Sequence, residues 1–142
     1  MSPFIGEFAG TALLIIMGAG VVANVLLTNT KGQNSGWIVI TFGWAMAVFI
    51  GVYASTNLGG SGHINSAITI ALTVFGDFDA ALMPTYILAQ FSGAFVGACI
   101  AWLAYKQHFD VTTDADLKMA VFCNSPAIRN VGYNLITECI GT

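Results

Sequence analysis

The stretch Gly62-His63-Ile64-Asn65-Ser66-Ala67-Ile68-Thr69 joins a polar turn to the first residues of a short apolar run. The run ends near Gly76 and is too short to cross a bilayer, since a spanning helix needs about 20 apolar residues. This length predicts a half-helix that enters a membrane and stops inside it. Such a helix presents free backbone N–H groups and a partial positive charge at its N-terminus, and water-lined pores use this arrangement to select solutes.

The composition of the chain favours lipid as its surroundings. Of 142 residues, 56% are hydrophobic and 8% are charged, whereas a typical soluble domain carries about 25% charged residues. The net charge of -3 and the scattered Lys and Arg residues argue against a nucleic-acid partner. The cysteines, histidines and acids show neither metal-ligand nor nucleophile–base spacing. The sequence therefore predicts no metal site, no cofactor and no enzymatic activity.

Four apolar segments have spanning or near-spanning length. They run from about Phe4 to Leu27, from Trp37 to Ser55, from Leu82 to Tyr105, and onward from about Tyr133. Each should be helical, because backbone groups in lipid have no other hydrogen-bond partners. We expect a polar loop over residues 106–130. The order predicts an all-α membrane protein with three transmembrane helices, one re-entrant half-helix and the start of a fourth span.

A short internal repeat indicates the domain organisation. Glu7-Phe8-Ala9-Gly10-Thr11 and Glu138-Cys139-Ile140-Gly141-Thr142 both read Glu-x-x-Gly-Thr, and each lies at or in an apolar segment. Weak internal symmetry is typical of inverted repeats in membrane transporters. The interpretation is a single membrane domain over residues 1–142, with a first repeat at 1–131 and the truncated start of a second at 132–142.

Glycines spaced four residues apart predict close helix packing in the first and third spans. Small residues at this spacing let two membrane helices approach to backbone distance. The pairs are Gly6 with Gly10 and Gly93 with Gly97.

Asn65 is the residue of the opening stretch best suited to orient a solute. At a helix N-cap its side-chain oxygen can accept from a backbone N–H of the first turn, which leaves its NH2 group free to donate. Irregular backbone before it survives at membrane depth only if it is buried in protein or lines an aqueous cavity. Its carbonyl groups would then be acceptors for water or a polyol. The alternative is an ordinary loop followed by a short surface helix.

The chain resembles the first half of the aquaporin and glycerol-facilitator family, the major intrinsic proteins, over essentially its whole length. The family loop reads Ser-Gly-(Gly/Ala)-His-(Leu/Ile)-Asn-Pro-Ala-Val-Thr, which is similar to Ser61-Gly62-His63-Ile64-Asn65-Ser66-Ala67-Ile68-Thr69. Further family-like stretches follow in order, at Gly6-Glu7-Phe8-Ala9-Gly10-Thr11, Gly43-Trp44-Ala45-Met46-Ala47-Val48 and Ala89-Gln90-Phe91-Ser92-Gly93-Ala94.

The resemblance implies the six-span inverted-repeat channel fold and passive transport. The solutes it implies are glycerol, other small neutral molecules and water, passing through a multi-pass protein of the cell (plasma or inner) membrane. Full-length members of the family assemble as homotetramers, each subunit with its own pore.

The resemblance also assigns roles to individual residues. The implied pore residues are Trp44, Ser61, Gly62, His63, Ile64, Asn65 and Ala67. Trp44 would line the selectivity filter, as in glycerol-conducting members, and its indole offers a wide apolar wall to the carbon backbone of a polyol. The alternative is a lipid-facing or helix-packing side chain. Glu7 and Glu138 would be structural supports that accept backbone N–H bonds from half-helix loops.

Two departures from the family pattern bear on function. Position 66 is Ser where the family usually has Pro, which pre-organises the first helical turn, so we expect a looser start to the half-helix. The family's second half-helix, with its own Asn-Pro-Ala and a filter Arg, does not occur in these residues. We expect an incomplete first half that does not conduct alone. The alternative is a half-size membrane subunit that needs a second repeat or a partner chain.

Two signals for membrane orientation disagree. The positive charges fall in the first loop and at or in the third, which would place those loops in the cytoplasm and the N-terminus outside. The resemblance implies a cytoplasmic N-terminus. We follow the resemblance, because the chain has only 4 Lys and Arg residues.

Overall fold

Three long helices form the body of the computed structural model, which describes residues 2–141 and contains no strand within that range. They are α1 (Pro3–Leu26), α2 (Trp37–Asn57) and α4 (Met83–Ala104). Each is long and apolar enough to cross a membrane. The predicted all-α fold with three spanning helices is confirmed, and the helix bounds differ from the predicted spans by at most two residues.

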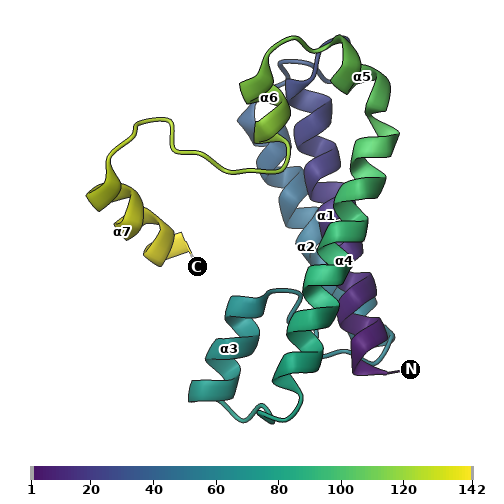
Figure 1. Cartoon of the computed structure of the whole chain (residues 1–142), viewed down its shortest axis with the longest axis vertical. Coiled ribbons are helices and arrows are strands. Elements are labelled where there is room, and N and C mark those ends of the chain that lie inside the picture. Colours follow the sequence, from purple (N-terminus) through teal and green to yellow (C-terminus); the bar gives the residue numbers. More distant parts are fainter. Residues whose placement is uncertain (1, 142) are drawn as a thin grey trace.

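Helix α1 packs against both α2 and α4 along the bundle (Figure 1). Its contact with α4 is close because Gly93 and Gly97 face its backbone. A Cβ atom at Gly93 would lie 2.3 Å from the carbonyl oxygen of Phe8, and one at Gly97 would lie 2.6 Å from that of Ala12. The predicted close packing is confirmed, since neither position has room for a side chain.

The short helix α3 (Ser66–Phe75) has 10 residues. It lies beside the half of α4 nearest the N-terminus of the chain, and packs on α4 (Figure 1). The predicted half-helix therefore exists, although Ile64 and Asn65 belong to the turn and the N-cap rather than to the helix. An irregular segment, residues 58–65, connects α2 to α3.

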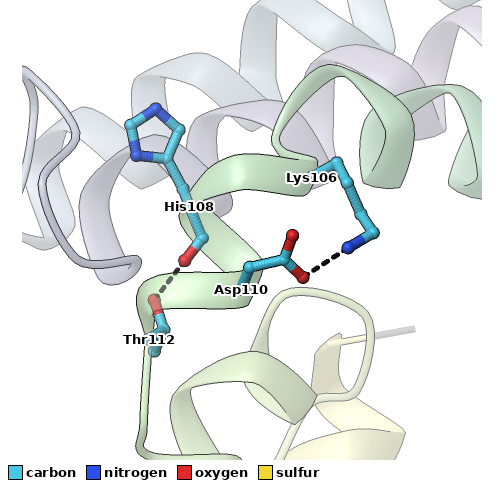
Figure 2. Close-up of polar contacts among 4 residues, drawn as sticks. All are labelled: Lys106, His108, Asp110 and Thr112. Carbon is cyan, nitrogen blue, oxygen red and sulfur yellow. Dashed lines mark hydrogen bonds and ion pairs between the residues drawn. The ribbon is translucent and has the colours of Figure 1, made fainter.

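The expected loop over residues 106–130 is wrong in part, because two short helices form within it. They are α5 (Lys106–Val111) and α6 (Ala115–Ala120), at the end of the bundle opposite α3 (Figure 1). Figure 2 shows the ion pair between Lys106 and Asp110, one turn apart on α5. Asp114 caps α6 by accepting from the backbone N–H of Asp116 at 2.8 Å. These short-range charge and capping signals were present in the sequence.

Thr112 ties the connection between α1 and α2 to α5. Its hydroxyl donates to the carbonyl oxygen of His108 at 2.7 Å, the contact drawn in Figure 2, and accepts from the backbone N–H of Thr28 at 2.9 Å. The His108 Nδ1 atom lies 3.0 Å from the carbonyl oxygen of Thr28. Thr112 is only 1% exposed, so water cannot replace these bonds freely.

Helix α7 (Val131–Gly141) stands apart from the bundle in Figure 1. None of its residues is buried. It begins two residues before the predicted start near Tyr133, and it corresponds to the predicted beginning of a fourth span.

Replacing Thr112 by Val should lower the free energy of unfolding by about 1 kcal/mol, because the partly buried Thr28 N–H would lose its acceptor. The measurement is denaturant unfolding of the protein in detergent micelles. Thr137→Val is the matched control, since the exposed Thr137 hydroxyl bonds only within α7. Equal effects of the two substitutions would contradict a special role for Thr112.

Candidate functional site

The carboxylate of Glu7 is the centre of the polar interior of the bundle. It projects from α1, is fully buried, and accepts five hydrogen bonds. Oε1 accepts from Ser55 Oγ at 2.8 Å and from the backbone N–H groups of Ser61 at 3.2 Å and His63 at 3.1 Å. Oε2 accepts from the backbone N–H of Ile64 at 2.8 Å and from Gln90 Nε2 at 2.9 Å. An ionised carboxylate can only accept, and here every neighbour donates.

The irregular segment bends sharply where Glu7 holds it. Gly62 has φ +74° and Ile64 has φ +41°. A positive φ is rare for a β-branched residue such as Ile64 and persists only where the surroundings enforce it. The bond from the Ile64 N–H to Glu7 and the burial of the Ile64 side chain provide that constraint.

His63 attaches the same segment to its neighbours through its ring. The ring Nδ1 lies 3.1 Å from Thr69 Oγ1 on α3. The ring also packs against Phe78 and Tyr86, with centroids 4.7 Å and 5.1 Å away. Tyr86 in turn pairs its hydroxyl with Ser61 Oγ at 2.8 Å. His63 is therefore held inside the protein by several contacts.

Asn65 is the N-cap of α3, and its side-chain oxygen accepts from the backbone N–H of Ala67 at 2.8 Å. The hydrogen bonds within residues 2–141 leave the Asn65 NH2 group without a protein acceptor, and the residue is exposed. It lies beside an open groove of about 210 Å³ between α1, α3 and α4. The groove is lined by Thr11, Leu14, Ile15, Ile64, Asn65, Ser66, Gln90, Phe91 and Ala94.

Trp44 lies in a different part of the bundle. Its ring packs on Gly18 of α1, where an added Cβ atom would come within 2.4 Å of the indole. The ring also lines a cavity of about 580 Å³. The cavity residues are Val22, Leu26, Trp37, Ile40, Thr41, Trp44, Ala120, Cys123, Asn124, Ser125 and Glu138. The Trp44 side chain therefore both packs between helices and lines the cavity.

The structure gathers most of the candidate residues at one place but not all of them. Glu7, the segment from Ser61 to Ile64, Asn65 and Ala67 meet at the start of α3. Trp44 and Glu138 instead line the separate cavity. Glu138 is exposed on α7, and within residues 2–141 its carboxylate makes no hydrogen bond. A supporting role for Glu138 stays a prediction.

Comparison with known proteins places this geometry in a family. The family model described as major intrinsic protein matches residues 1–142. The chain belongs to the major intrinsic protein family. This family is one of membrane channels and transporters. The membership, together with the three long apolar helices, confirms the prediction of a multi-pass membrane protein.

The similarity to individual members of the family covers the whole chain. The chain is 54% identical over 142 residues to a probable glycerol uptake facilitator protein of Thermotoga maritima. It is 44% identical over 142 residues to a glycerol uptake facilitator protein of Streptococcus pneumoniae. These matches cover 100% of the chain but 60% of either relative. The X-ray structure of the aquaglyceroporin from Plasmodium falciparum matches with a TM-score of 0.68 and 37% identity, over 76% of this chain and 43% of that one. The chain thus spans about 60% of the length of these curated relatives.

Sequence reasoning missed several residues of the polar interior. Ser55, Thr69, Tyr86 and Gln90 all bond to the segment before α3, to Glu7 or to each other. The available signal was a polar side chain inside an apolar helix, as at Ser55 and Gln90, because such groups need partners in lipid. That signal indicates that a partner exists but does not identify it.

Replacing Glu7 by Gln should destabilise the protein by about 3 kcal/mol or more, because either orientation of the amide sets its NH2 group against backbone N–H donors. The measurement is the free energy of unfolding in detergent micelles. The exposed Asp77→Asn is the matched control and should leave stability within about 0.5 kcal/mol. A loss for Glu7→Gln as small as that of the control would refute the central role of this carboxylate.

Proposed function

We propose that these residues form one half of a pore for the passive passage of glycerol or other small neutral solutes, and water, across the cell membrane. The observation that carries the proposal is the start of α3, where Asn65 caps the helix and keeps an unpaired NH2 group beside an open groove. A fixed donor at the positive end of a short helix can orient a neutral solute while disfavouring cations.

The segment before α3 supplies acceptors to complement this donor. Glu7 binds the N–H groups of Ser61, His63 and Ile64, which leaves the carbonyl groups of this segment, from Ser61 to Ile64, to line the path. A neutral molecule that both donates and accepts hydrogen bonds can exchange its water partners for these groups at little cost. Small polyols and water have this property.

Trp44 favours a polyol over water alone. Its indole gives an apolar wall to a cavity that also has the polar side chains of Thr41, Asn124 and Ser125. One apolar and one polar wall suit a molecule with CH groups on one side and hydroxyl groups on the other. Relatives described as glycerol uptake facilitators point to the same solute class.

We further propose that a second repeat completes the pore. The groove beside Asn65 is open, and large apolar side chains such as Phe91 and Phe95 of α4 are more than 60% exposed. In the proposed arrangement residues 1–131 are the first repeat, Glu138 supports the second, and full-length subunits form homotetramers. No chemical step is involved, because the solute crosses unchanged.

Replacing Trp44 by Ala or Phe should lower the ratio of glycerol to water permeability, because the apolar wall facing the carbon backbone becomes smaller. The measurement is stopped-flow light scattering of liposomes that contain the protein expressed from its own gene. Trp102→Phe is the control, since Trp102 lies outside the Trp44 cavity on α4. An unchanged ratio in both Trp44 variants would remove this residue from the filter.

The half-pore proposal is tested by comparing two proteins in the same assay. Residues 1–142 alone should give liposomes whose glycerol permeability equals that of empty vesicles, because the groove beside Asn65 stays open. The protein expressed from its own gene should raise it. Rapid glycerol flux through residues 1–142 alone would refute the need for a second repeat.

A further inference from the structure

Gln90 is a buried amide whose orientation is determined by its neighbours. The residue is 3% exposed. Its Nε2 atom lies 2.9 Å from Glu7 Oε2 and 2.9 Å from Thr69 Oγ1. Since a carboxylate only accepts, the NH2 end of the amide must face Glu7. Both N–H bonds of Gln90 are then in use, and its Oε1 atom needs a donor of its own.

Ser66 provides that donor. Its Oγ lies 2.9 Å from Gln90 Oε1 and donates to it. Among residues 2–141, no other hydrogen bond reaches this oxygen. Ser66 is the first residue of α3, directly after the cap Asn65, whereas Gln90 lies in the first half of α4. The bond therefore joins the first turn of the half-helix to a spanning helix.

Two contacts with one amide control the direction of α3 better than one. Ser66 and Thr69 are three residues apart and lie on the same face of the helix, and both bond to Gln90. With Thr69 alone, Gln90 would hold α3 at only one point. The Asn65 cap bond joins two residues at the start of α3 and makes no link to α4.

We propose that Ser66 is a positioning residue, whose hydroxyl holds the first turn of α3 against α4 through Gln90 and so sets the direction of the Asn65 NH2 group. This inference rests on the proposed function of Asn65 as a donor to the solute. From the sequence we expect a looser start of α3, because Ser66 replaces the usual Pro. The hydrogen bond from Ser66 to Gln90 is a constraint on that start which the expectation did not include. A binding group works only when its neighbours hold it close to the productive geometry.

The test uses the protein expressed from its own gene, reconstituted in liposomes, with glycerol and water permeability measured separately. Ser66→Ala should lower the ratio of glycerol to water permeability by about threefold or more, because the donor to Gln90 is lost. Ser66→Cys, nearly the same size but a weak donor, should show the same loss and serves if the Ala variant does not fold. Ser66→Thr keeps the hydroxyl and should keep the ratio.

Ser92→Ala is the matched control, because the Ser92 hydroxyl bonds only to backbone carbonyls of its own helix α4. A second readout is amide hydrogen exchange at Thr69, whose N–H bonds to the Asn65 carbonyl in the first turn of α3. Exchange there should accelerate in Ser66→Ala and stay unchanged in Ser92→Ala. Exchange at Ala47, buried in α2, should not change in either variant.

The outcomes separate this inference from the proposed function. If the parent protein conducts glycerol but Ser66→Ala changes neither the permeability ratio nor exchange at Thr69, the positioning role is wrong and the pore proposal stands. If the parent protein does not conduct, the pore proposal fails, while exchange at Thr69 still decides whether Ser66 holds α3. If Ser66→Thr lowers the ratio of glycerol to water permeability as much as Ser66→Ala does, the role of the hydroxyl is also overturned.

Discussion

The buried carboxylate of Glu7 is the interaction on which the candidate site depends. It stands on α1 and collects donors from α2, from the segment before α3 and from α4. At membrane depth there is no bulk water to satisfy a bent backbone. The free N–H groups of Ser61, His63 and Ile64 would each cost free energy without an acceptor. One carboxylate provides that acceptor for all three, which makes an irregular segment possible between apolar helices.

The position of the short helix α3 depends on this polar network, because α3 buries little of its own surface. α3 packs on α4, and it has one buried residue, Thr69. Its position relies on polar ties that start from Glu7 and run through Gln90 to Thr69 and Ser66. Networks of this kind are cooperative, and each bond is stronger in a low-dielectric interior. The result is a helix start at which Asn65 has a defined direction.

The opposite end of the bundle is held by different means. There Thr112 bridges the connection after α1 to α5 with two hydrogen bonds, and the indole of Trp44 rests on Gly18. Helix α1 is common to both ends, and glycines at its contacts keep it within backbone distance of its neighbours. Helix α1 therefore carries Glu7 at one end and supports the indole of Trp44 nearer the other.

The sequence by itself determined the order of the spanning helices and the half-helix, because the length of an apolar run sets what can cross a bilayer. It also pointed to Asn65 as a cap, since capping depends on neighbouring residues alone. The expected loop over residues 106–130 missed α5 and α6, because local charge and capping signals do not by themselves decide whether helices of 6 residues form. Only the tertiary structure decided which groups meet Glu7 and Ser66, because Gln90 lies 83 and 24 residues away from them. Such pairings arise from how helices pack, and no local pattern encodes them.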